Sequence, residues 1–220
     1  MANRIPTPIL WMLIITAFTI TGCGQTPIVS TPTQIPAPME EATPPTPAVT
    51  LLELVRNISD NNMAVRLVSI YELDKYGKGA VIAIPALIDN LNVDYSEVQV
   101  AAIIALGHLG PDAQDAIPGL VDRLHNDGDI HVKSAAATAL GFIGDEAIVP
   151  DLAAALFEDN PPYDVAISCA RSLAIITGEK FTDFDSETGY SIDKDGVPFI
   201  VIDARKWWLE TGQYHNWSSK

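Results

Sequence analysis

A pattern of apolar positions recurs along residues 51–178 with a period of 33 or 34 residues. In each copy a valine is followed by a small residue four positions later, a leucine eight positions later, and a glycine twelve or thirteen positions later. Apolar side chains at offsets 0, 4, 7, 8 and 11 from the valine fall on one side of a helix with 3.6 residues per turn, so the pattern predicts four amphipathic helices that end at the glycines. The valines are Val65, Val98, Val132 and Val165, the leucines are Leu73, Leu106, Leu140 and Leu173, and the glycines are Gly77, Gly110, Gly144 and Gly178.

A second set of apolar positions keeps the same period and predicts a shorter helix before each of these four. Pro85, Pro118 and Pro150 fall in the first turns of three of the shorter helices, where a proline costs least because its missing N–H would have no partner. One helix pair cannot bury its apolar face alone, so the sequence predicts an all-α solenoid of about four stacked pairs. The second set comprises Leu54, Leu87, Leu120 and Leu152, followed four positions later by Ile58, Leu91, Leu124 and Leu156.

The segments Val98–Gly110 and Ala116–Leu120 resemble the short HEAT repeats that are also labelled phycobilisome-lyase-type HEAT-like repeats. The resemblance covers residues 51–178 and implies a right-handed α-solenoid. It is weak as to function, because this repeat serves lyases and hydroxylases and, far more often, scaffolds.

Residues 179–220 depart from the repeat and are expected to cap its C-terminal end. Trp207 or Trp208 would cover the apolar end of the last helix pair, which would otherwise face water. Asp195-Gly196 is a turn signal between the segments 190–192 and 197–202, so a small β-hairpin is expected in the cap.

Residues 1–22 are typical of an export signal, because Arg4 precedes an uncharged apolar run over residues 9–20 that is too short to span a bilayer. Ile20-Thr21-Gly22-Cys23 resembles the bacterial lipobox, which implies cleavage before Cys23 and acylation of its sulfur, with palmitate among the attached chains. The alternative is a signal peptide, or a retained anchor, followed by an unrelated cysteine.

Residues 23–50 are expected to form a disordered stalk between the lipidated cysteine and the repeats. Seven prolines and six threonines fall between residues 24 and 50, with almost no large apolar side chains. Proline removes a backbone donor, and the segment has too little apolar area to offset the entropy of ordering.

The formal net charge of −15, from 28 acidic and 13 basic residues, excludes nucleic acid as an expected partner. Binding to a phosphate backbone gains its affinity from Lys and Arg, and the sequence contains no basic stripe.

No expected catalytic, metal or cofactor site emerges from the sequence. None of His108, His125, His131 and His215 is followed by glutamate, whereas HEAT-repeat hydroxylases hold iron through His-Glu dipeptides. His125 and His131, with Asp127 and Asp129, fit solvated turn residues better than metal ligands. Cys169 takes the small-residue position between helices, where a thiol is buried and inert.

The acidic insert 183–195 leaves one alternative open. It is rich in carboxylates but fails the EF-hand spacing, so ordinary turns are expected there, with a metal-dependent sensor or enzyme as the rival interpretation. Bilin-lyase activity is disfavoured for an exported chain, because bilins are attached in the cytoplasm.

The function predicted from the sequence is a non-catalytic, lipid-anchored HEAT-repeat scaffold that binds a protein partner at the cell membrane or outer membrane of a bacterium. Offsets 2, 6 and 9 from each repeat valine point away from the expected core. At these offsets Leu67, Tyr71, Val100 and Ile104 would form an apolar strip across two repeats. The strip is either the partner-binding surface or a surface that the superhelix or the C-terminal hairpin covers.

Overall fold

The computed structural model describes residues 50–158, 161–182, 192–193 and 195–218, which belong to one compact unit. Residues 1–49 lie outside this description, and with them the predicted signal peptide, Cys23 and all of the stalk except Thr50. The helices are α1 (Leu51–Asn57), α2 (Met63–Leu73), α3 (Ile84–Asp89), α4 (Ser96–Leu109), α5 (Ile117–Asn126), α6 (Ile130–Ile143), α7 (Val149–Leu156), α8 (Tyr163–Thr177) and α9 (Phe199–Glu210). Short 3₁₀ segments join several of them, the longest being Asp74–Ala83 and Gly110–Ala116.

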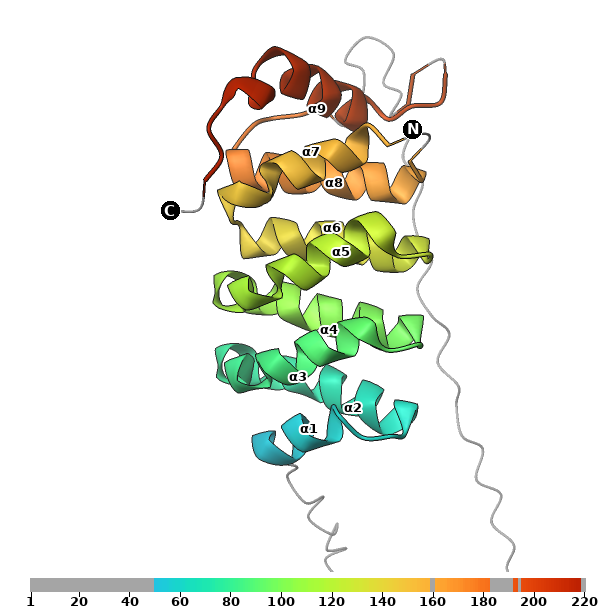
Figure 1. Cartoon of the computed structure of the whole chain (residues 1–220), viewed down its shortest axis with the longest axis vertical. Coiled ribbons are helices and arrows are strands. Elements are labelled where there is room, and N and C mark those ends of the chain that lie inside the picture. The colour runs from blue at the N-terminus through green and yellow to red at the C-terminus, as the bar shows by residue number, and fades with distance from the viewer. Residues whose placement is uncertain (1–49, 159–160, 183–191, 194, 219–220) are drawn as a thin grey trace, which may run out of the picture. The chain divides into compact units, whose positions relative to one another are not determined.

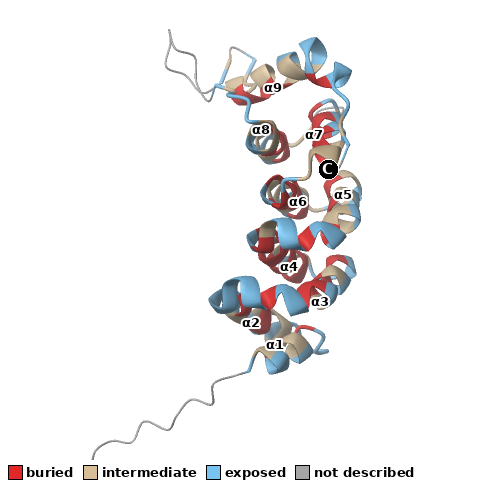
Figure 2. Cartoon of the chain, turned by 90° about the vertical axis from the view of Figure 1, so that its left-hand side faces the viewer, coloured by how far each residue is buried: buried red, intermediate tan, exposed pale blue. Residues whose placement is uncertain are grey.

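Four successive helix pairs, α1/α2 to α7/α8, stack in order along this unit (Figure 1). The second helices α2, α4, α6 and α8 form one layer, and the first helices α1, α3, α5 and α7 form the other (Figure 2). Each second helix packs on its own first helix and on the second helices of the neighbouring pairs. The predicted all-α solenoid of about four pairs is therefore confirmed.

The helix ends follow the predicted prolines and glycines with one exception: α2 ends at Leu73, four residues before the predicted Gly77, and the chain continues there as the 3₁₀ segment Asp74–Ala83. Pro85, Pro118 and Pro150 each occupy the first turn of their helix. Gly144 and Gly178 end α6 and α8 in the left-handed conformation, with φ of 76° and 74°, which glycine adopts without a Cβ penalty.

The leucines and small residues of the repeat build a continuous core between the two layers. Leu106, Leu140 and Leu173 are fully buried, and Ala102, Ala136 and Cys169 fill the small-residue positions beside them. A short side chain at these positions lets adjacent helices approach closely, so the regular spacing of the pattern becomes close packing.

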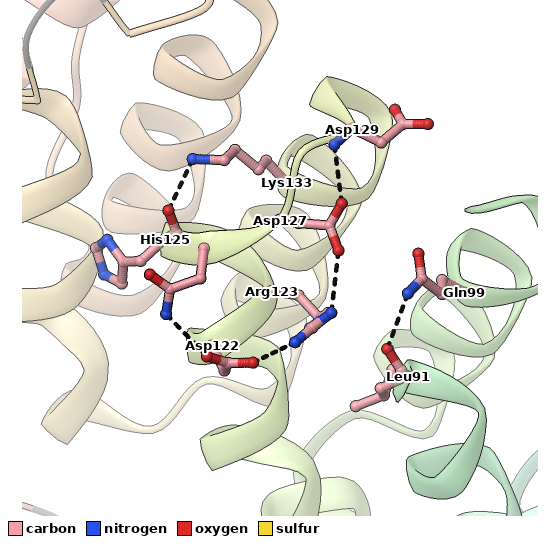
Figure 3. Close-up of polar contacts among 9 residues, drawn as sticks. Leu91, Gln99, Asp122, Arg123, His125, Asp127, Asp129 and Lys133 are labelled. Atoms are coloured by element: carbon pink, nitrogen blue, oxygen red, sulfur yellow. Dashed lines mark hydrogen bonds and ion pairs between the residues drawn. The ribbon is translucent and has the colours of Figure 1, made fainter. Parts of the chain in front are cut away.

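In the first three repeats, the residue after the repeat valine donates a hydrogen bond from its side chain to a backbone carbonyl that precedes the second helix. Arg66 donates to the Asp60 carbonyl. Gln99 Nε2 donates to the Leu91 carbonyl at 3.1 Å, and Lys133 Nζ donates to the His125 carbonyl at 2.9 Å (Figure 3). The fourth repeat has Ala166 at this position and cannot donate.

The cap helix α9 supplies the donor that the fourth repeat lacks. Arg205 Nε donates to the Leu156 carbonyl at 2.8 Å, and Ile200, Val201 and Ala204 are buried against the last pair. Helix α9 packs on both α7 and α8, and it lies across the end of the stack in Figure 1.

Among the described residues of the predicted β-hairpin in the cap, the structure shows one antiparallel bridge, between Ile192 and Pro198, closed by a turn at Gly196, while residues 190, 191 and 194 lie outside the description. The second expected strand, over residues 197–202, is wrong from Phe199 onward, because α9 begins there. Its buried residues recur at helical spacing and continue into Trp207 and Trp208, which both pack against the core.

Candidate functional site

A groove of about 570 Å³ runs along the free face of the second helices α4, α6 and α8. Three rows of side chains line it, at equivalent positions in successive repeats. Val100, Ser134 and Ile167 lie at offset 2, Ile104, Thr138 and Arg171 at offset 6, and His108 and Phe142 at offset 10.

The free face of a second helix is narrower than the helical wheel alone predicts. Interior second helices are packed on three sides: by their own first helix and by a second helix above and below. Consequently the expected outward position at offset 9 is wrong for Gly107 and Gly141, which are buried. A Cβ on Gly107 would lie 3.1 Å from Ala139 Cα, so this glycine belongs to a helix–helix contact.

Of the four residues predicted for partner binding, two line the groove and two do not. Val100 and Ile104 line the groove, whereas Leu67 and Tyr71 hold the same offsets on α2, outside the lining. Tyr71 is 63% exposed and Ile104 is 43% exposed, while Leu67 and Val100 are half-buried against the core.

His108 and Phe142 line the groove and were missed by the sequence analysis. Phe142 is half exposed, at 50%, which is unusual for a phenylalanine in a repeat helix. The sequence contains a signal for these two positions. Offset 10 follows offset 6 by four residues, and residues four apart lie on the same face of a helix.

Arg171 gives the groove a cationic position. Its side chain is exposed and makes no hydrogen bond or ion pair with any residue that the structure describes. By contrast, the His108 ring lies at the groove beside Asp74, with Nδ1 3.0 Å from Oδ1. Asp164 and His131 line the end of the groove where α8 and α6 begin.

The hydroxyl groups of Ser134 and Ser168 are held apart from the imidazole of His108. Ser134 Oγ lies 2.8 Å from Ser168 Oγ, at offsets 2 and 3 of their repeats, whereas His108 stands at offset 10. At 1.5 Å per residue, seven to eight positions separate these groups by about 11 Å along the helix axes. The His108 imidazole therefore does not form a nucleophile–base pair with either serine, because such a pair requires hydrogen-bond contact.

The Cys169 thiol is fully buried, and this burial raises its pKa to about 12, with the nearby Glu158 carboxylate adding to the shift. Only the thiolate is nucleophilic, so the thiol is unreactive at neutral pH. Its predicted place among the small residues between helices is confirmed.

The polar residues of the turn between α5 and α6 bind one another (Figure 3), and His125 also contacts the adjacent repeat. Asp127 pairs with Arg123 at 3.2 Å, and His125 Nδ1 lies 3.0 Å from Glu158 Oε1. Asp129 caps α6 by accepting the His131 backbone N–H at 2.8 Å, which holds the pKa of this carboxyl below its usual range. Across the described ranges of the chain, no three His, Cys, Asp or Glu side chains gather as a metal site would require.

The acidic insert is only partly described. Residues 183–191 and 194 lie outside the description, whereas Asp193 accepts the backbone N–H groups of Asp195 and Val197, at 2.9 and 2.8 Å. In the part of the chain that the structure covers, no helix is both long and apolar enough to cross a membrane.

Comparison with known proteins supports the repeat assignment. A family model described as HEAT repeats matches residues 84–174. Among solved structures, the complex of CpcE and CpcF of phycocyanin lyase from Nostoc sp. PCC7120 is similar at 21% sequence identity and a TM-score of 0.48, covering 67% of this chain and 71% of that chain. No curated protein matches the chain. Residues 84–174, from the start of α3 into α8, are therefore HEAT repeats.

Proposed function

We propose that the chain is a lipid-anchored protein-interaction module at the bacterial cell envelope, which binds its partner in the groove and does not catalyse a reaction. The HEAT repeats over residues 84–174 support a scaffold, because solenoids of this kind use an extended repeat face for binding. The observation that carries the proposal is the groove itself, with exposed apolar side chains beside a cation that has no partner among the described residues.

The chemistry of the groove defines the kind of partner. Ile104 and Phe142 offer apolar contact area, and Arg171 offers a charge in a protein with only 13 Lys and Arg against 28 Asp and Glu. A bidentate arginine–carboxylate pair provides directional recognition. The partner is a protein segment that places an apolar side chain against Ile104 and Phe142 and a carboxylate against Arg171.

Substituting Ile104→Glu in the groove, together with Tyr71→Glu at the same offset on the adjacent helix α2, is expected to abolish partner binding without a change in melting temperature. Both side chains are exposed in the free protein, so the new carboxylates stay hydrated there, whereas a bound partner would strip water from them. The measurement is photo-crosslinking in cells with a benzophenone amino acid at position 142, which should yield one defined adduct in the parent chain and none in the variant.

Leu209→Glu is the matched control, because Leu209 is equally exposed but lies on α9, outside the groove. This control should crosslink like the parent, and Arg171→Glu should reduce the adduct by repelling the partner's carboxylate. Unchanged adduct in the double variant would remove the groove as the binding site. A large fall in the melting temperature of either single variant would assign Tyr71 or Ile104 to the core.

Cys23→Ser is expected to leave the chain uncleaved and unlipidated, because processing of a prolipoprotein requires the acylated sulfur. Burial of acyl chains contributes about 0.8 kcal/mol per methylene, so two or three chains give a lasting anchor that the variant lacks. Mass spectrometry and detergent partitioning measure both effects. A variant still cut before residue 23 would contradict the proposed lipidation and leave an ordinary signal peptide as the explanation.

A further inference from the structure

A second, smaller pocket of about 250 Å³ lies between the C-terminal end of α8 and the cap. Trp207, Trp217 and His215 line it with aromatic rings, and Glu146 and Glu179 line it with carboxylates. No lysine or arginine is among the described residues of its lining, although Lys180 and Lys206 are close in sequence. The pocket is separate from the groove along α4, α6 and α8.

The chain after α9 folds back to build this pocket. Gly212 is buried against the two indoles of α9, and a Cβ added there would lie 2.6 Å from Trp208 and 2.9 Å from Trp207. Trp217 Nε1 then donates to the Gly212 carbonyl at 2.8 Å, which fixes the orientation of the Trp217 ring. The final segment thus places a second indole, that of Trp217, beside Trp207 in the pocket.

The aromatic rings meet at tilted angles, and Trp207 also lies near Phe181 and Trp208, at centroid distances of 5.8 and 6.2 Å. The Trp207 and Trp217 centroids are 6.1 Å apart with an interplanar angle of 57°, and His215 stands 4.3 Å from Trp217 at 48°. The two tilted indoles of Trp207 and Trp217 line the pocket together with Glu146 and Glu179.

We propose that this pocket binds a quaternary or methylated ammonium group. Tryptophan faces attract such cations more strongly than other aromatic rings do, and a bulky, weakly hydrated ammonium gives up little hydration on entering. The negative carboxylates of Glu146 and Glu179 also attract a cation at longer range. Pockets that bind drug-sized ligands have volumes of about 300–1,000 Å³, so a pocket of 250 Å³ suits a smaller group such as trimethylammonium.

Choline, titrated into the full chain in a non-ionic detergent, tests the proposal directly. Binding is followed through the indole N–H signals in NMR spectra and through tryptophan fluorescence. The matched probe is 3,3-dimethylbutan-1-ol, which has the shape of choline without the charge. We expect saturable shifts with choline and none with the neutral alcohol. Equal binding of the two would overturn the proposal, since it would show an apolar pocket without cation recognition.

Two matched pairs of variants assign the site. Glu179→Gln should weaken choline binding about fivefold, whereas Glu210→Gln, an exposed carboxylate at the end of α9, should not. Trp217→Leu should weaken it at least fivefold, whereas Tyr214→Leu, which alters an exposed side chain outside the lining, should not. Because Glu179 is exposed, its substitution tests the site even if loss of Trp217 unfolds the cap. Unchanged binding in Glu179→Gln and Trp217→Leu would refute the assignment.

The source of the ammonium group is distinguished with short-chain lipids. A lipid headgroup is the ligand if dihexanoylphosphatidylcholine binds at least as tightly as choline and dihexanoylphosphatidylglycerol does not bind. Binding of choline alone identifies a small solute. Binding of neither choline nor the phosphatidylcholine refutes the proposed site while leaving the partner groove untouched.

Discussion

Leu140→Ala is expected to lower the free energy of unfolding by about 2–5 kcal/mol. Leu140 lies on α6 at the centre of the stack and is fully buried between the two layers. Truncation removes three carbon atoms from close-packed surroundings, and α6 cannot collapse into the space because neighbouring repeats hold it on both sides. Leu106→Ala, at the equivalent position of α4, should have a similar effect.

Urea unfolding followed by circular dichroism measures this loss. A domain stable by about 5–15 kcal/mol would lose a large part of its stability. Leu209→Ala serves as the control, since that side chain is half exposed and its truncation leaves no internal cavity. Losses below about 1 kcal/mol at both Leu106 and Leu140 would show that these leucines do not fill the core as described.

Gly141→Ala is expected to destabilise the protein by about 2 kcal/mol. A Cβ at this position would overlap Ser172 Oγ and lie 3.0 Å from Ser172 Cα, so both the side chain and the backbone of α8 would have to move. Overpacking costs about 1–3 kcal/mol. Displacing Ser172 also breaks its buried hydrogen bond to the Ala137 carbonyl, 2.8 Å long, which adds about 1 kcal/mol.

The gain in helix propensity from glycine to alanine, about 1 kcal/mol, opposes these costs without cancelling them. Gly128→Ala is the control, because no atom lies within 4 Å of the added Cβ in that turn. Thermal unfolding of both variants measures the difference. Equal stability of Gly141→Ala and the parent would mean that α6 and α8 have room to separate.

The cap illustrates how a short apolar segment misleads sequence analysis. Residues 197–202 are apolar and four of the six are β-branched, and a run of this length does not distinguish a strand from the start of a buried helix. The distinction depends on residues further along the chain, because Ala204, Trp207 and Trp208 continue the apolar face at helical spacing. With Arg205 bonded to the Leu156 carbonyl, α9 stacks as a further layer on the last pair.

The sequence by itself determined the repeat, the helix pairs, most of their ends and the leucine core, because each of these depends on contacts within one repeat or with the next one along the chain. Only the tertiary structure decided which side chains stay free. Packing from both neighbours buries Gly107 and Gly141 and leaves offsets 2, 6 and 10 to form the groove. It also unites Glu146, Glu179 and Trp217, which no spacing in the sequence connects, because they meet only where the C-terminal segment folds back on the last repeat.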